Sequence, residues 1–219
     1  MYLSGKGLSG FLRTVGKTRQ HRFIHNMTDY TAWPVIGRGA ERICYLNPFD
    51  KTRLVKISPK KNAKQTLREI KYFRFLIKRG IPFDHIPKFY GEIIGDDFIG
   101  FEQEFIPGTD PRHDLIPETL EQYISCLSSQ EDIHKLRNAL EKLKAYLLRY
   151  NIIPSDLLPD NIVVRHDDAE LKLILIDGLG STELIPASNY FKVLGNRKIL
   201  RKWDKFSKRL FAKYRQLNI

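Results

Sequence analysis

Three polar residues in the second half of the chain have the types and spacing that kinase-type phosphoryl transfer requires. Asp156 and Asn161 lie five residues apart in one loop, and Asp177 ends an apolar run sixteen residues after Asn161. An aspartate in such a loop can orient the acceptor hydroxyl, while an amide and a second carboxylate hold the magnesium that bridges nucleotide phosphates. We therefore expect Asp156 to be catalytic and Asn161 and Asp177 to bind the metal. If the loop stood alone, a turn rich in Asp, Asn and Pro would be the better interpretation.

Upstream residues could hold the phosphates of the nucleotide. Gly37 and Gly39 lie between two β-rich runs, where glycine lets the backbone approach phosphate, although Arg42 replaces the third glycine of the Gly-x-Gly-x-x-Gly pattern. Lys56 lies in an alternating strand, from which it would reach the α and β phosphates. Glu69 follows thirteen residues later on a predicted helix, a suitable separation for a carboxylate that pairs with Lys56 and orients it. An exposed lysine and a glutamate paired at helical spacing are the alternative interpretations.

The elements that would position these residues follow from apolar periodicity. Helical spacing predicts helices over 63–79 and 130–150, and an alternating run predicts a strand over 98–106. In a kinase fold, that strand leads to the connector between lobes, where the backbone of Glu104 and Ile106 would meet adenine. The order of glycine turn, lysine strand, glutamate helix, connector, long helix, catalytic loop and metal-binding aspartate is therefore complete.

Beyond these single motifs, the chain resembles the YrbL family, the PhoP-regulatory-network proteins of Gram-negative bacteria. The matching segments are 39–45, 68–72, 86–91, 131–137, 157–162 and 184–186. The resemblance implies an α+β, two-lobed protein-kinase-like fold with a β-rich N-lobe and a shortened helical C-lobe, similar in turn to bacterial lipopolysaccharide sugar kinases. It also implies that Lys56 grips the phosphates and that Glu69 holds Lys56. The same roles as above follow for the other three: Asp156 as base, with Asn161 and Asp177 on magnesium.

The expected organisation is a basic N-terminal arm over 1–32, an N-lobe over 33–106 and a C-lobe over 107–219. The motifs depart from the protein-kinase pattern in three places. Pro154-Ser155 replaces the His-Arg before the catalytic aspartate, Leu158 replaces a lysine, and the segment Asp177-Gly178-Leu179-Gly180 lacks the phenylalanine of Asp-Phe-Gly. Only 41 residues follow Gly178 and they contain no Ala-Pro-Glu motif, so a sugar-like or membrane-borne acceptor is favoured over a peptide.

Charge is concentrated at the two ends of the chain. The net charge is +12, and residues 180–219 alone contain ten Lys or Arg and two Asp or Glu. Apolar residues recur three and four apart in this segment, namely Leu200, Trp203, Phe206, Leu210, Tyr214 and Leu217. The segment is therefore predicted to be a helix whose apolar side closes the C-lobe and whose basic side either is solvated or rests on anionic lipid. The N-terminal segment with Phe11, Leu12 and Val15 among basic residues is either a second, weaker membrane contact or merely a flexible arm.

Composition limits the remaining function classes. No apolar run is long enough for a membrane-spanning helix, no export signal is evident, and the histidines lack ligand spacing. We expect a cytoplasmic protein, in part peripheral at the inner membrane, with Cys44 and Cys126 reduced and neither bound to metal.

These observations favour an ATP- and Mg²⁺-dependent phosphotransferase that acts on a non-peptide hydroxyl, such as a lipopolysaccharide sugar or another membrane-borne acceptor. The alternative is a catalytically silent nucleotide-binding regulator, a pseudokinase whose basic surface docks a partner. Non-specific nucleic-acid binding is a minor alternative, because it is suggested by charge alone and no nucleic-acid-binding motif accompanies it.

Overall fold

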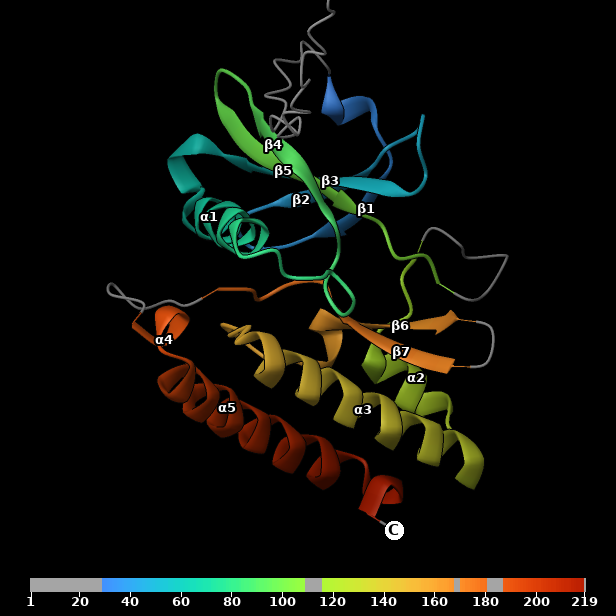
Figure 1. Ribbon diagram of the computed structural model, residues 1–219. Helices are drawn as coiled ribbons and strands as arrows, with labels where there is room; N and C mark the ends of the chain where they lie inside the picture. Colours follow the sequence, from blue (N-terminus) through green and yellow to red (C-terminus); the bar gives the residue numbers. More distant parts are fainter. Residues whose placement is uncertain (1–28, 109–115, 168–169, 181–186, 219) are drawn as a thin grey trace, which may run out of the picture.

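An antiparallel sheet of five strands forms the N-terminal half of the molecule (Figure 1). The computed structural model describes residues 29–108, 116–167, 170–180 and 187–218. The strand order is β1-β2-β3-β5-β4. The strands are β1 (Val35–Arg38), β2 (Ile43–Leu46), β3 (Arg53–Pro59), β4 (Phe89–Ile94) and β5 (Phe98–Glu104).

The register of the sheet decides which side chains share a face. Cys44 pairs with Lys56, whereas Tyr45 pairs with Val55. Because directly opposed residues point to the same side of a sheet and neighbours in a strand alternate, Lys56 and Cys44 lie on one face. Tyr45 and Val55 lie on the other face, in an apolar cluster that also contains Tyr30.

Helix α1 (Lys64–Lys78) covers part of the sheet and confirms the helix expected over 63–79. Its inner side carries apolar residues at helical spacing, and Phe73 stacks on Phe89 of β4 with ring centroids 5.0 Å apart. Glu69 comes from the same inner side and is only 2% exposed. The packing of α1 therefore carries a carboxylate into the interior.

The C-terminal half is mainly helical. It contains α2 (Leu120–Cys126), α3 (Gln130–Tyr150), α4 (Ala187–Tyr190), α5 (Lys192–Lys213) and a two-stranded ribbon of β6 (Ile162–Asp167) and β7 (Glu170–Leu175). Helix α3 coincides with the helix expected over 130–150 and packs against both β7 and α5 (Figure 1). The Ser129 side chain accepts from the Asp132 amide at its start, and Asn151 ends it in the left-handed region with φ 53°.

Helix α5 confirms the expected apolar side in all but one position. Trp203, Phe206 and Leu210 of α5 are buried against the helical half, as are Tyr214, which caps α5, and Leu217 in the short 3-10 helix Arg215–Asn218 that follows it. Leu200 is 47% exposed, because it lies about 100° around the helix from the buried Ile199. The prediction that Leu200 belongs to the buried side was therefore wrong.

The boundary of the N-terminal arm also differs from the prediction. Tyr30 is buried within a short 3-10 helix, Tyr30–Ala32, and its ring meets that of Phe98. Residues 29–32 thus pack with the sheet, whereas the rest of the arm, with Phe11, Leu12 and Val15, lies outside the described residues. Among the residues that are described, no helix is both long enough and apolar enough to cross a bilayer.

Candidate functional site

The loop with Asp156 and the segment with Asp177 lie against each other below the sheet. The amide of Ser155 donates to the carbonyl of Gly178 at 2.6 Å, and Pro154 bridges to Leu179 in antiparallel fashion. The amide of Ile176 donates to the carbonyl of Asn161 at 2.9 Å. These backbone bonds bring the three residues predicted for catalysis and metal binding to one place.

Gly178 is required for this close approach. Its φ is 71°, a region that other residues rarely adopt, and an added Cβ would lie 2.7 Å from the carbonyl oxygen of Asp156. The same Cβ would lie 3.4 Å from Nδ2 of Asn161. A glycine after Asp177 therefore lets Asp156 and Asn161 pack directly on the backbone of this segment.

Lys56 reaches the same place from the sheet. Its side chain is buried, and its Nζ donates to the carbonyl oxygen of Ile176 at 2.7 Å. Ile176 directly precedes Asp177, so the ammonium group of Lys56 lies beside the predicted metal-binding carboxylate. The structure thus brings Lys56 next to the residues with which the sequence analysis grouped it.

Glu69 does not have the partner that the sequence predicted. The Arg42 guanidinium forms ion pairs with Glu69 through Nη1 and with Asp177 through Nη2. Arg42 is 5% exposed, and Oε1 of Glu69 has no hydrogen-bond partner among the described residues. The expected Lys56–Glu69 pair is therefore replaced by Arg42, which stands at the position of the missing third glycine.

The charged groups of this cluster shift one another's pKa values. Burial alone would raise the pKa of Asp177, but Lys56 and Arg42, together with hydrogen bonds from Arg42 and the Gly178 amide, lower it to about 2. Burial alone would lower the pKa of Arg42, but its two carboxylate partners, Glu69 and Asp177, have the larger effect and raise it. Burial raises the pKa of the Cys44 thiol. Asp177 and Arg42 are thus both charged, and Cys44 is a protonated thiol at neutral pH.

The donor set fits a magnesium ion held mainly by nucleotide phosphates. Oδ1 of Asp177 accepts from Arg42, from Gln65 at 3.3 Å and from the Gly178 amide at 2.5 Å. Among the described residues, Oδ2 is the oxygen that a metal could still use, with the Asn161 amide group nearby. Magnesium commonly binds one or two protein groups and completes its shell with phosphate and water. The described ranges contain no group of three or more His, Cys, Asp or Glu that could hold a metal by itself.

A small cavity lies beside Lys56 on the same face of the sheet. It has a volume of about 130 Å³, and its lining includes Gly37, Lys56, Glu104 and Ile106. These are four of the five residues predicted to bind the nucleotide. Gly39, the fifth, does not line it. The apolar remainder of the lining includes Leu54, Phe105 and Ile176.

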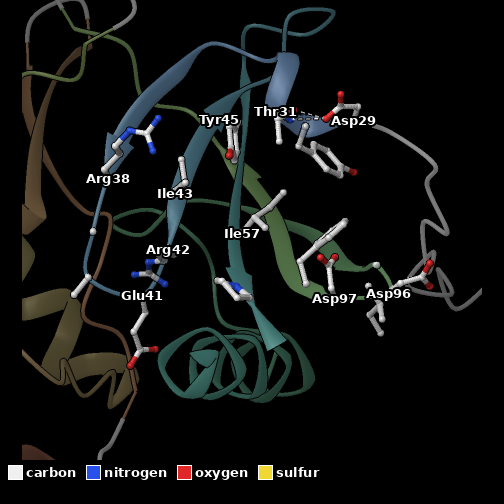
Figure 2. A pocket seen from close by; sticks show the side chains of 17 residues that line it. Asp29, Thr31, Arg38, Glu41, Arg42, Ile43, Tyr45, Ile57, Asp96 and Asp97 are labelled. Atoms are coloured by element: carbon white, nitrogen blue, oxygen red, sulfur yellow. Dashed lines mark hydrogen bonds between the residues drawn. The ribbon is translucent and has the colours of Figure 1, made fainter. Parts of the chain in front are cut away.

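A larger cavity of about 920 Å³ lies on the opposite face of the sheet (Figure 2). Ile43, Tyr45 and Ile57 contribute to its wall, and Asp96 and Asp97 lie at one side of it. It contains Gly39 and Arg42 but neither Lys56 nor Asp177. Sequence analysis did not predict this cavity, because its lining comes from the turns at both ends of the sheet.

The side chain of Asp156 is exposed, and one residue from α5 lies close to it. Nζ of Lys202 donates to the carbonyl oxygen of Ser155 at 2.6 Å. Burial lowers the pKa of Lys202, and the nearby Lys198, Arg201 and Lys205 lower it further, whereas Asp156 acts in the opposite direction. Sequence analysis predicted α5 as basic but gave no signal that Lys202 would adjoin the candidate catalytic loop.

The described chain is thus a mixed α+β protein, with an antiparallel N-terminal sheet and a helical C-terminal part. A cluster of two cations and two carboxylates lies where they meet. The family model described as PhoP regulatory network protein YrbL matches residues 31–211. The protein therefore belongs to the YrbL family, as the resemblance of its motifs indicated.

Two relatives have the same degree of similarity. The proteins described as "Uncharacterized protein YrbL" from Escherichia coli (strain K12) and Shigella flexneri are each 31% identical over 175 residues. The match covers 78% of this chain and 82% of each relative. The family-model match over residues 31–211 spans the sheet, the charged cluster and most of the helical part.

Proposed function

We propose that this protein is an ATP- and Mg²⁺-dependent phosphotransferase with a two-lobed kinase-like fold, acting on a non-peptide hydroxyl. Residues 33–106 would form the N-lobe and residues 107–219 the C-lobe. The observation that carries the proposal is the convergence of Lys56, Asp177 and the Asp156 loop, with a cavity beside Lys56. Residues from both halves, far apart in the chain, meet there with the types that phosphoryl transfer needs.

Each residue then has a defined task. The backbone of Glu104 and Ile106 would receive adenine, and Lys56 would bind the α and β phosphates. Oδ2 of Asp177 and the Asn161 amide would hold magnesium, which neutralises phosphate charge when it is bound. Asp156, exposed at the edge of the site, would accept the proton of the attacking hydroxyl.

Nucleotide binding requires a rearrangement around Arg42. The cavity of about 130 Å³ is smaller than the roughly 300–1,000 Å³ of common ligand pockets, so the hairpin of β1 and β2 has to move outward. Arg42 lies directly before β2 and would move with it, releasing Asp177. Because Oε1 of Glu69 has no hydrogen-bond partner among the described residues, it could then receive Lys56.

Titration calorimetry with ATP, with and without magnesium, tests the proposal. The parent protein should bind ATP more tightly with magnesium, and Asp177→Ala should lose that dependence. Asp156→Asn should keep nucleotide binding and lose phosphate transfer to acceptors. Absence of ATP binding under all conditions would overturn the proposal, as would loss of nucleotide binding in Asp156→Asn.

One observation favours a second candidate, a nucleotide-binding regulator without catalysis. Arg42 holds both Glu69 and Asp177, so a resident guanidinium could take over the charge neutralisation that magnesium otherwise provides. This candidate predicts ATP binding that does not depend on magnesium and is not followed by turnover. The same calorimetry therefore distinguishes the two.

A further inference from the structure

A group of large apolar side chains is exposed where α4 passes into α5. Tyr190, Phe191, Val193 and Leu194 are between 46% and 72% exposed. Single exposed apolar residues are normal on a protein surface, but a contiguous group of this size usually marks a site of interaction. We call these four residues the apolar tip and consider it a candidate interaction site.

The apolar tip is held firmly by the rest of the helical part. The ring of Tyr190 packs edge-on against Phe75 of α1, with centroids 5.5 Å apart. The side chain of Asn151, at the end of α3, donates to the carbonyl of Ser188 at 2.9 Å. Gly195 then lets α5 pass directly over Asn151, where a Cβ would collide with its side chain. The exposed side chains are thus presented by an anchored helix start.

The sequence that contains the tip is basic. The segment 187–203 contains five Lys or Arg and no Asp or Glu. Residues spaced three and four apart share one side of a helix. The side that begins with the tip consists of Phe191, Leu194, Lys198, Arg201 and Lys205, which we call the docking face. It presents apolar residues at one end and cations along the rest.

The docking face adjoins the candidate catalytic loop. Lys202 lies next to Arg201 on α5 and bonds to the carbonyl of Ser155, directly before Asp156. About 12 Å of helix separates Leu194 from Lys202 at 1.5 Å per residue. A planar partner lying along the docking face would therefore extend to the edge of the Asp156 site.

We propose that the docking face binds the surface of an anionic lipid bilayer, with Phe191 and Leu194 entering the interface and the exposed Arg201 and Lys205 contacting headgroups. Exposed apolar side chains and nearby Lys and Arg together supply the two attractions, apolar burial and charge, that hold peripheral helices on anionic membranes. A second copy of the chain fits the face poorly, because Lys198, Arg201 and Lys205 would meet their own like charges. This inference rests on the proposed function. With the docking face on the bilayer, an acceptor hydroxyl at the depth of the lipid headgroups would reach Asp156.

Vesicle flotation tests this proposal directly. The full chain is mixed with vesicles of phosphatidylcholine alone and with vesicles that also contain phosphatidylglycerol. We expect binding to the anionic vesicles only, reduced by salt and by the variant Arg201→Glu/Lys205→Glu. Since each cation near such a surface adds on the order of 1 kcal/mol, loss of the two cations alone should weaken binding by roughly 30-fold, and the two added carboxylates should weaken it further.

Matched variants on the sheet half serve as controls. Lys51→Glu/Lys88→Glu makes the same change in net charge at two exposed positions and should retain most of the binding. Phe191→Ser/Leu194→Ser should bind weakly, whereas Phe49→Ser, which removes a ring that is 89% exposed, should bind like the parent. Circular dichroism of each variant checks that the helices are retained.

Three outcomes would overturn the proposal. They are equal binding to neutral vesicles, equal loss in the two charge variants, and a dimer of the parent chain that Phe191→Ser/Leu194→Ser dissociates. The test is independent of phosphate transfer, because Asp177→Ala should float with anionic vesicles as the parent does. Flotation without ATP binding would support the membrane-binding docking face and refute the phosphotransferase proposal. ATP binding without flotation would support nucleotide binding and refute the docking face.

Discussion

Two charged regions lie on either side of Gly178: a buried cluster that contains Asp177, and the surface where α5 passes the Asp156 loop. Cations and carboxylates are equal in number in the first region, whereas cations are in excess in the second. In the buried cluster, Arg42 and Lys56 face Glu69 and Asp177, so two cations meet two carboxylates. Near Asp156, Lys202 is within electrostatic reach of three further cations of α5, Lys198, Arg201 and Lys205, and of the Asp156 carboxylate. The first region satisfies its charges within the fold. The second keeps an excess of positive charge on the surface, which suits an anionic partner.

The comparison predicts the largest effect for the buried cluster. Arg42→Met would leave Glu69 and Asp177 without their shared cation, and breaking a buried ion pair from one side costs about 3–5 kcal/mol of unfolding free energy. Urea unfolding measures this loss. The control is Arg53→Met, because the ion pairs of Arg53 with Asp50 and Glu102 are partly exposed and should contribute about 0–1 kcal/mol. Equal losses in both variants would contradict the role given to Arg42.

The next effect concerns the backbone that joins the two regions. Gly178→Ala should cost about 3 kcal/mol, because left-handed strain adds to the displacement of the Asp156 carbonyl. Gly80 has a similar φ of 64°, but an added Cβ there meets nothing within 4 Å. Gly80→Ala should therefore show the strain alone, about 1–2 kcal/mol. Unfolding curves of the two variants separate the cost of backbone strain from the cost of the contact with the Asp156 carbonyl. A smaller loss of stability for Gly178→Ala than for Gly80→Ala would refute the close approach of Gly178 to that carbonyl.

Acid sensitivity should also come from the buried cluster. The pKa of Asp177 is lowered from 3.8 to about 2 in the folded state, so folding favours its charged form. The resulting stability, roughly 2 kcal/mol, is complete above pH 4 and is lost as the pH falls toward 2. Asp177→Asn should be less stable than the parent at pH 6, and the difference should shrink at pH 2. A difference that does not change with pH would show that the charge of Asp177 is not involved.

The elements of the fold followed from the sequence better than the contacts of the site did. Apolar periodicity gave α3 and α1 closely, and alternation put Lys56 in a strand, whereas the structure shows that its side chain reaches the backbone next to Asp177. Periodicity reports which side of an element is buried, but it does not report which of two cations a buried carboxylate meets. Arg42 and Asp177 are 135 residues apart, and only the packing of the sheet on the helical part brings them together.

The same limit applies to α5. Its basic side was evident from the sequence, but the crossing of α5 beside the Asp156 loop depends on how Gly195 passes over Asn151. The exposed apolar tip was missed for a related reason, since Tyr190 and Phe191 precede the periodic part of the helix. The charge pattern thus left open whether the basic side of α5 is solvated or rests on anionic lipid, and tertiary packing decides which of its residues adjoin the Asp156 loop.

The smallest predicted effect probes the excess charge beside Asp156. The pKa of Lys202 is lowered by burial and by Lys198, Arg201 and Lys205, against the opposing effect of Asp156. Asp156→Asn should therefore lower the pKa of Lys202 further, and Lys205→Gln should raise it. The chemical shift of the Lys202 ε carbon, followed by NMR against pH, measures both changes.

A matched control uses another lysine of the same helix. Lys208 pairs with Asp204 on the outer side of α5, so Lys208→Gln should leave the pKa of Lys202 unchanged. Equal responses to Lys205→Gln and Lys208→Gln would mean that Lys202 senses only the net charge of the helix. A response confined to Lys205 and Asp156 would show that the cations are gathered at the candidate catalytic loop, where an anionic partner could neutralise them.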